Sequence, residues 1–306
     1  MTSNQWIALV AAIVGGALRV GTPFLFVSLG ECLTEKAGRI NLGLEGVLVL
    51  SAMTAFGGAW LSGSAWAGVL AGAIAGALLA LLHGLLCSLK GVNDIATGIA
   101  LMLLGMGLAF YLGKPLIQPQ APQLPAISLG GWSNNSAVRA ALEVNALLPI
   151  GLTMALGIWW AFAHTRVGLL VRMAGDSAQA TRALGYSVTK LRIVTTAMGG
   201  AIAGLGGASL TLFYPGSWNE GISSGQGLIA VALVIFARWS PLRCIGAALL
   251  FGGAGAIGPA LQSIGIGWGY HLFNIVPYVL TLLILVMTCR PGKTAAGSPG
   301  ELASAT

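Results

Sequence analysis

A short polar segment, Glu31–Gly46 (ECLTEKAGRINLGLEG), holds the side chains best suited to chemistry in a chain that is otherwise strongly apolar. An ionisable group held at membrane depth is costly and usually lines a cavity. Asn41 and Glu45 lead directly into an apolar run, so we expect them to line a substrate pathway. The Lys36 and Arg39 end of the segment fits an ordinary solvated loop equally well. The charged residues of the segment are Glu31, Glu35, Lys36, Arg39 and Glu45.

A second polar group, Asn93 with Asp94, opens the apolar run that starts at Ile95. Asn and Asp are favoured helix caps because their side chains accept hydrogen bonds from unpaired N–H groups of the first turn. Capping is therefore the first interpretation, and a substrate contact is the alternative. We include Asn93 with Asn41 and Glu45 among the pathway candidates, because amide and carboxylate groups can hydrogen-bond a polar solute.

A third polar stretch, Gly168–Arg192, is too polar to span a membrane. Within it, Ser177–Leu184 can form a short helix, with Asp176 or Ser177 as its N-cap and Gly185 as its C-terminal stop. A short amphipathic helix at the membrane surface suits docking to a partner protein, and a plain interfacial linker is the alternative.

The sequence lacks the patterns typical of an enzyme or a metal protein. Its histidines lack metal-ligand spacing, and no two cysteines form a C-x-x-C pair. Gly292-Lys293-Thr294 resembles the end of a phosphate-binding loop, but Met287 stands where a glycine is required. We predict no catalytic residue, no metal site and no cofactor, and expect no ATP hydrolysis by this chain alone. The residues weighed are His83, His164, His271, Cys32, Cys87, Cys244 and Cys289.

Long apolar runs must position these polar segments. A helix rises about 1.5 Å per residue, so about 20 apolar residues cross the roughly 30 Å hydrocarbon layer. The chain is 56% hydrophobic and only 8% charged, whereas a soluble domain carries about 25% charged residues. We predict an all-α polytopic membrane protein with nine or ten transmembrane helices. The runs are Trp6–Val27, Leu44–Leu61, Ala65–Leu89, Ile95–Leu112, Ala146–Ala163, Ile193–Phe213, the shorter Gly227–Ala237, Leu242–Leu261 and Leu272–Met287.

Basic residues are concentrated in alternate joints between these runs, so the positive-inside rule explains the net charge of +7 better than nucleic-acid binding does. This rule places residues 173–186 and the C-terminus in the cytoplasm, and places Gly113–Asn145 and Tyr214–Gly225 outside. The N-terminus lies outside if Trp6–Val27 is one span. A break near Pro23 would instead give ten helices and an inside N-terminus.

Several smaller features complete the predicted architecture. We expect a transmembrane domain over residues 1–290 and a disordered cytoplasmic tail over 291–306. The spacing Gly68-x-x-x-Gly72-x-x-x-Gly76 predicts close helix packing. Ser64-Ala65-Trp66 and Trp239-Ser240-Pro241 each begin a small-residue span, and an inverted repeat is one interpretation of this echo. Tryptophans near span ends are interpreted as an aromatic belt, at Trp60, Trp66, Trp132, Trp218, Trp239 and Trp268.

Four stretches together resemble the membrane permease subunits of bacterial ATP-binding cassette (ABC) importers for branched-chain amino acids, simple sugars and nucleosides. Glu35–Gly46 resembles the family pattern ERAGVINLGLEG, and Gly91–Asn93 with Ile95–Leu104 resembles GVNEVVSGLALNLL. Gly175–Tyr186 is similar to GENPEAARALGI, and the stretch from Ser217 through ALVIFARWSPL fits the pattern GSFVEGMTAGRGFIALAAVIFGRWRPL. The likeness extends from residue 15 to about residue 262 and is greatest to the nucleoside branch.

The resemblance implies a role in the bacterial cytoplasmic membrane. Two permease subunits, here two different chains, form the pathway; separate ATPase subunits power it, and an extracytoplasmic binding protein delivers the solute. Ser177–Gly185 would be the coupling helix that docks on the ATPase. The sequence departs from the family residues at Asp176, Ser177, Ala178 and Thr181. The implied coupling residues are Ser177, Arg182, Ala183, Leu184 and Gly185.

The leading functional hypothesis is therefore an importer permease for a nucleoside. A simple sugar or another small polar solute is the alternative within the same class. An ion-coupled secondary transporter would need charges deep in its helices, and the spans after residue 95 contain almost none. An intramembrane enzyme would need paired catalytic groups within the spans, which the sequence lacks.

Overall fold

The computed structural model describes residues 3–263, 275–288 and 297–304. Within these residues, seven helices are long and apolar enough to cross a membrane, which confirms a polytopic helical membrane protein. The predicted count of nine or ten spans is not confirmed. The span-length helices are α1 (Ser3–Lys36), α2 (Leu44–Ser62), α3 (Ala65–Leu86), α4 (Asp94–Gly113), α6 (Leu147–His164), α9 (Val188–Leu212) and α11 (Pro241–Ser263).

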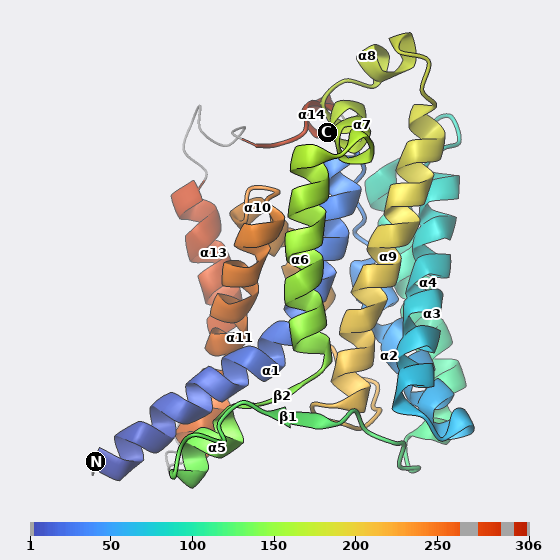
Figure 1. The fold of residues 1–306 in the computed structure, drawn as a ribbon. Coiled ribbons are helices and arrows are strands. Elements are labelled where there is room, and N and C mark those ends of the chain that lie inside the picture. Colours follow the sequence, from blue (N-terminus) through green and yellow to red (C-terminus); the bar gives the residue numbers. More distant parts are fainter. Residues whose placement is uncertain (1–2, 264–274, 289–296, 305–306) are drawn as a thin grey trace.

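The long helices run side by side, and the shorter elements lie mainly at the two ends of the bundle (Figure 1). At one end, β1 (Ala126–Ser128) pairs antiparallel with β2 (Glu143–Asn145), and α5 (Ser136–Ala141) lies between them in sequence. At the other end lie α7 (Arg166–Asp176), α8 (Ala178–Ala183) and α14 (Gly300–Ser304). We call these the α5 end and the α8 end. The remaining elements are the 3-10 turn η1 (Lys114–Leu116), α10 (Gln226–Phe236) and α13 (Val276–Thr288).

Glycine faces bring α3 and α9 into close contact. A Cβ atom placed on Gly76 would lie 2.3 Å from the Gly200 carbonyl oxygen, and one on Gly204 would lie 2.4 Å from the Gly72 carbonyl oxygen. Only residues without a side chain permit this backbone approach. The glycine spacing in residues 68–76 therefore does serve tight helix packing, as predicted.

Helix α1 is continuous through Pro23 and extends to Lys36. The alternative of a broken first segment is therefore wrong. Figure 1 shows the helix leaning away from the bundle near its N-terminus and standing upright further on. Because the helix continues beyond Val27, it carries Glu31 and Glu35 in its last turns, where both side chains are buried.

Helix α10 has only 11 residues and begins in the interior of the bundle. Its first residues lie against Glu45 at the start of α2, and the neighbouring Gly46 packs on Met102, well inside α4. The preceding segment starts near the α5 end, where the Trp218 Nε1–H donates to the Gly113 carbonyl at 3.0 Å. Part of the predicted external joint Tyr214–Gly225 is therefore buried, which satisfies the rule that irregular backbone at membrane depth must be covered by protein.

Two of the tryptophans assigned to an aromatic belt are buried instead. Trp218 is 2% exposed and Trp239 is 8% exposed. Both indole N–H groups have partners inside the protein: Trp218 donates to Gly113, and Trp239 donates to the Glu35 carboxylate. Trp268 lies outside the described residues.

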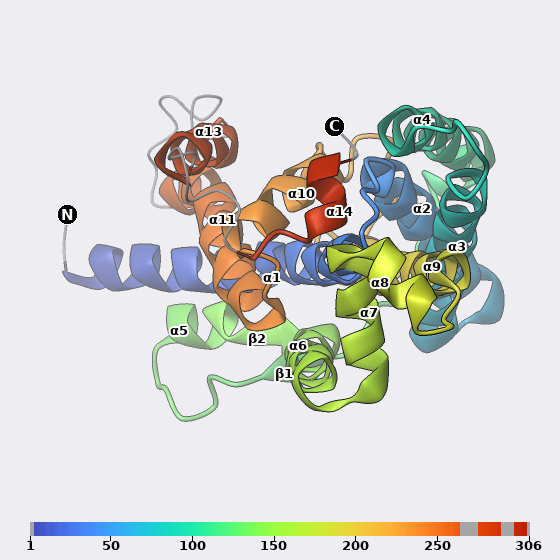
Figure 2. The same ribbon diagram turned by 90° about the horizontal axis from the view of Figure 1, so that it is seen from above.

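The segment 297–304 differs from the disordered tail predicted over 291–306. It forms a turn followed by α14, and the Leu302 side chain is only 8% exposed. The segment lies across the α8 end between α10 and α7 when the molecule is viewed along its helices (Figure 2). Its own polar contacts, described below, explain this order.

Candidate pathway and coupling sites

Asn41 is buried in the loop between α1 and α2, where it shapes the backbone. Its side-chain oxygen accepts a hydrogen bond from the Gly43 N–H at 2.9 Å. Its own N–H donates to Oε1 of Glu31 at 2.8 Å, and Asn41 is 2% exposed. These contacts join the loop to the last turns of α1.

Glu45 joins the start of α2 to the start of α10. Its carboxylate accepts hydrogen bonds from the Ser223 hydroxyl at 2.5 Å, from the Gly225 N–H at 3.1 Å and from the Gly227 N–H at 2.7 Å. Gly227 permits the contact, because a Cβ there would lie 2.5 Å from the Glu45 Cα. The negative charge therefore lies at the positive N-terminus of a short helix, where it is stabilised.

Asn93 is the N-cap of α4, which confirms the capping interpretation. Its side-chain oxygen accepts from the N–H groups of Ile95 and Ala96 at 2.9 and 3.0 Å. The residue also lines a polar cavity of about 220 Å³ at the α8 end. The charged residues lining this cavity are Arg39, Asp94, Arg192 and Glu301.

Arg39 and Asp94 form an ion pair in the wall of that cavity. Their side chains are 12% and 17% exposed, so the pair is largely shielded from water. The pair connects the loop after α1 with the first turn of α4. Arg39 is therefore not a solvated loop charge. It pairs with Asp94 at the start of α4, a contact that the sequence spacing did not reveal.

His83 is a buried group with a hydrogen-bond partner inside the protein. Its side chain is 1% exposed, and its Nε2 lies 3.1 Å from the Ile40 carbonyl oxygen. This contact holds the loop after α1 against α3. His164, at the end of α6, lies near Trp160 instead, and His271 lies outside the described residues.

The predicted coupling segment folds as its sequence indicates. Ser177 is the N-cap of α8 and its hydroxyl accepts a hydrogen bond from the Ala180 N–H at 3.2 Å. Gly185 ends the helix with a φ of +83°, a conformation that favours glycine. The Gly185 N–H donates to the Arg182 carbonyl, and the Tyr186 N–H donates to the Thr181 carbonyl.

The outer face of this segment is open to a partner. Arg182, Ala183 and Gly185 are exposed, and the apolar Leu184 and Tyr186 are 60% and 51% exposed. The whole segment stands beyond the ends of α9 and α3 (Figure 1). An exposed leucine and tyrosine beside an arginine form a suitable protein-docking surface.

Arg192, in the first turns of α9, is a hub that the sequence analysis did not single out. Its Nε–H donates to the Ala37 carbonyl at 2.9 Å, and its Nη2 donates to the Ala174 carbonyl at 3.1 Å. Nη2 also pairs with Oε2 of Glu301 at 3.1 Å. One side chain therefore connects the loop after α1, the end of α7 and the segment 297–304. Only its place in a basic stretch was visible in the sequence.

A second cavity, of about 310 Å³, lies at the α5 end between α1, α5 and α11. Most of its lining is glycine and alanine, and its polar members include Arg19 and Tyr214. The Arg19 guanidinium donates to the backbone carbonyls of Ala140 and Glu143, so the charge is held against the α5 end. The cavity lies within the volume range of small-molecule sites.

The structure thus separates the predicted site residues into three places. Asn41 and Glu45 are buried joints between helices, Asn93 lines the cavity at the α8 end, and the coupling residues lie on the exposed segment around α8. Arg192 lies in the same cavity wall as Asn93 and also contacts the end of α7, directly before α8. It therefore connects two of the three places.

Comparison with known proteins identifies the class of this chain. Residues 13–287 match the family described as the branched-chain amino acid transport system permease component. The chain belongs to this family, whose members are permease subunits of ABC transporters, and it is a multi-pass membrane protein of that class.

Its relatives differ in the solutes their names record. TsgC13 of Haloferax volcanii, provisionally named a glucose ABC transporter permease, is 30% identical over 84% of this chain and 79% of its own length. The nucleoside ABC transporter permease NupC of Lactococcus lactis is 28% identical over 90% of this chain and 91% of its own. The guanosine ABC transporter permease NupQ of Bacillus subtilis is 28% identical over 91% and 92%.

Proposed function

We propose that this chain is the membrane permease of a nucleoside importer, driven by a separate ATPase that docks on the exposed segment around α8. The observation that carries the proposal is the construction of that segment. Its outer face is exposed, while its inner side is connected through Ala178 and Ala174 to a hydrogen-bonded hub at the bundle end. A partner that moves α8 therefore also displaces the helices to which the segment is hydrogen-bonded.

The hub offers a route from the ATPase to the pathway. A displacement of α8 acts on Arg192 and hence on the loop after α1, through the Ala37 carbonyl. That loop continues to the Arg39–Asp94 pair and to Asn93, which line the cavity of about 220 Å³. Packed helices with two discrete arrangements turn such a displacement into opening at one end and closing at the other.

The charge arrangement favours a neutral solute. In many transporters the N-terminus of a broken helix binds an anionic group of the substrate. Here the N-terminus of α10 is already occupied by the carboxylate of Glu45. A nucleoside and a sugar are both neutral and rich in hydroxyl groups, so both suit such a pathway. The relatives NupC and NupQ favour the nucleoside, and TsgC13 favours the sugar as the second candidate.

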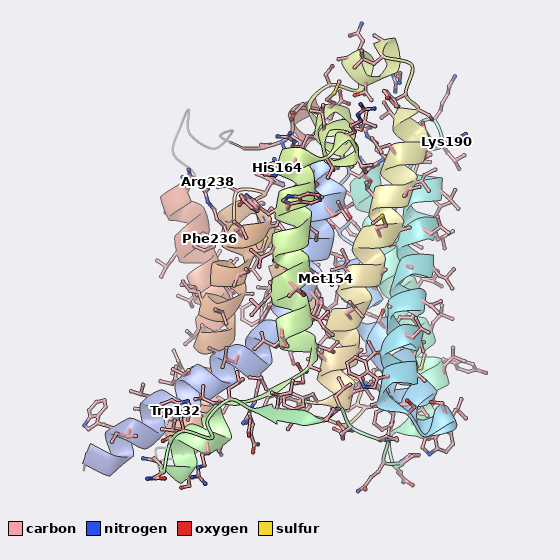
Figure 3. All side chains as sticks on the ribbon, in the orientation of Figure 1. Trp132, Met154, His164, Lys190, Phe236 and Arg238 are labelled. Carbon is pink, nitrogen blue, oxygen red and sulfur yellow. The ribbon has the colours of Figure 1, made fainter. Side chains whose placement is uncertain are left out.

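The proposed orientation puts the α8 end in the cytoplasm. Lys190 and Arg238 lie toward this end, and Trp132 lies at the other (Figure 3). This distribution follows the positive-inside rule. The α5 end would then meet the binding protein that delivers the solute. A second, different permease chain would complete the pathway, as the family resemblance implies.

The test is transport by the full complex in proteoliposomes, with the ATPase, the second permease and the binding protein present. We expect ATP-dependent uptake of labelled nucleosides, and little uptake of labelled hexoses. Uptake of hexose alone would favour the sugar alternative. Uptake driven by an ion gradient without the ATPase would contradict the proposal.

Two variants test the docking assignment directly. Arg182→Glu reverses a charge on the exposed face, and Gly185→Pro is incompatible with the φ of +83° at that position. Both variants are expected to insert normally and to lose co-purification with the ATPase. Lys190→Glu, on the same end of the protein but outside the coupling segment, is the matched charge-reversal control. Normal ATPase-driven uptake by both coupling variants would refute the assignment of α8.

A further inference from the structure

We propose that residues 297–304 form an intramolecular clamp on the coupling segment, and that Glu301 is the positioning residue of this clamp. The inference rests on the proposed coupling role of α8. It adds a residue that neither the family match nor the coupling motif includes, since the matched region ends at residue 287.

Glu301 bridges the coupling segment and the hub. Its Oε1 accepts a hydrogen bond from the backbone N–H of Ala178, the first residue of α8, at 2.9 Å. Its Oε2 pairs with Nη2 of Arg192 in α9 at 3.1 Å. One oxygen of the carboxylate therefore contacts α8, the helix proposed to dock on the ATPase. The other contacts α9, which runs through the bundle.

The rest of the segment is held in place around Glu301. The Lys36 ammonium at the end of α1 donates to the Gly297 carbonyl at 3.0 Å. A Cβ placed on Gly300 would lie 2.6 Å from the Asp176 carbonyl oxygen, so the segment lies directly on the end of α7. Leu302 is buried in the main hydrophobic cluster and anchors the other side. Three independent contacts therefore fix the position of the carboxylate.

The coupling segment needs such support because it is short. Helix α8 has six residues, and an isolated helix of that length is not stable in water. Apart from its cap at Ser177, its contacts with the bundle include the buried Ala178, which packs against Ala174 and Val188, and the bond from Ala178 to Glu301. Without the clamp, α8 keeps its exposed docking face but loses the direct link through Glu301 to Arg192.

The proposal predicts a specific failure: the ATPase still docks, but its movement is transmitted poorly. In Glu301→Ala, we expect the complex to co-purify as before and the ATPase to turn over. The solute transported per ATP hydrolysed should fall by about fivefold, which corresponds to a coupling free energy at the low end of the usual range. In Glu301→Gln, which keeps the shape and one acceptor oxygen, the solute transported per ATP hydrolysed should fall less.

The control is Glu220→Ala, an exposed glutamate in the segment before α10, far from α8 in the fold. It removes the same group and should leave the ratio unchanged. The double variant Glu301→Ala with Arg192→Ala should lower the ratio by less than the two single effects combined, because both substitutions break the same contact. A merely structural role would lower the yield of folded protein without this non-additivity in the ratio.

A second measurement needs no transport. A nitroxide label at Ala183→Cys, in a chain whose native cysteines are replaced by alanine, reports the mobility of α8 in nanodiscs without the ATPase. We expect a motionally restricted spectrum that becomes mobile with Glu301→Ala and stays restricted with Glu220→Ala.

The outcomes separate the clamp from the proposed function. An unchanged transport ratio and an unchanged label spectrum in Glu301→Ala would overturn the clamp. Loss of co-purification in Glu301→Ala would also overturn it, because Glu301 would then belong to the docking surface itself. If the unmodified complex does not import nucleosides but the label becomes mobile in Glu301→Ala, the proposed solute is wrong and the clamp stands.

Discussion

Two carboxylates in this protein, Glu45 and Glu301, make similar hydrogen bonds in very different settings. Glu45 is 4% exposed and bonds to three groups in the interior of the bundle. Glu301 lies at the bundle end beside a polar cavity, with a side chain 29% exposed, and bonds across elements that a partner can reach. The first setting makes a joint inside the bundle, and the second makes a joint between the bundle and the segments at its end.

The comparison teaches that a buried carboxylate between apolar runs can serve as a joint between helices. The start of α10 has N–H groups that find no partner within the helix, and Glu45 supplies acceptors for them. The Glu45 carboxylate is therefore hydrogen-bonded to groups of the protein itself. The predictions below test this division between interior joints and joints at the bundle end, from the largest expected effect to the smallest.

The largest effect is expected for Glu45→Ala. The substitution leaves the partly buried N–H of Gly225, the buried N–H of Gly227 and the buried Ser223 hydroxyl without their acceptor. Each orphaned buried donor costs about 1–3 kcal/mol, so we expect a loss of several kcal/mol of folding free energy. Thermal unfolding followed by size-exclusion chromatography measures it, with Glu220→Ala as control. A variant with unchanged stability and lost transport would make Glu45 a pathway residue instead.

For Arg192→Ala we expect a smaller loss of folding free energy than for Glu45→Ala, and a larger loss of solute transported per ATP hydrolysed. The hub then loses its bonds to Ala37, Ala174 and Glu301 together. Arg192→Lys should not restore coupling, because a lysine lacks the planar set of donors that reaches several acceptors at once. Transport per ATP hydrolysed is the readout. Full recovery with lysine would show that only the positive charge matters.

Asn93→Ala tests a local contact at the edge of the cavity. Loss of the N-cap of α4 should lower stability by about 1 kcal/mol. Asn93→Asp keeps the accepting oxygen and should retain this stability. If Asn93→Asp also retains full uptake, Asn93 acts only as a cap; reduced uptake at unchanged stability would assign it to the pathway.

The smallest effect concerns pH. Partial burial raises the pKa of Glu301, but the Ala178 N–H and the Arg192 side chain, with Arg182 nearby, lower it more, so the net pKa lies below its ordinary value of 4.5. A lowered carboxyl pKa means that the contact contributes fully above about pH 4.5 and is lost as the pH falls through the lowered value.

The other charged groups around the segment are Lys36, Arg238 and Asp176. We therefore expect the spectrum of the label at Ala183→Cys to stay constant over the neutral range and to become mobile in acid. The same change at neutral pH would contradict an ionised Glu301. The label in the Glu301→Ala chain serves as the pH control.

Much of the fold was predictable from local sequence. Apolar run length indicated the spans, and residue preferences at helix ends indicated the Ser177 cap, the Gly185 stop and the Asn93 cap. These features depend on neighbours within a few residues. The shortness of α10 was also visible in its apolar run, although its start in the bundle interior was not.

The hub could not be predicted in this way. Arg192 and Glu301 are 109 residues apart, and Trp239 and Glu35 are 204 residues apart. Nothing in the local sequence of either partner indicates which distant residue it will contact. The same limitation made Trp218 and Trp239 resemble belt residues, since both lie near span ends and only the tertiary packing buries them.

The most direct test of the account is the sidedness and protection of the coupling segment. A membrane-impermeant maleimide applied to Ala183→Cys, in the cysteine-free chain, should label the protein in inverted membrane vesicles and not in intact spheroplasts. Added ATPase should then block the labelling. Labelling from the outside, or labelling from the inside that the ATPase does not block, would contradict a motor that drives this permease through α8.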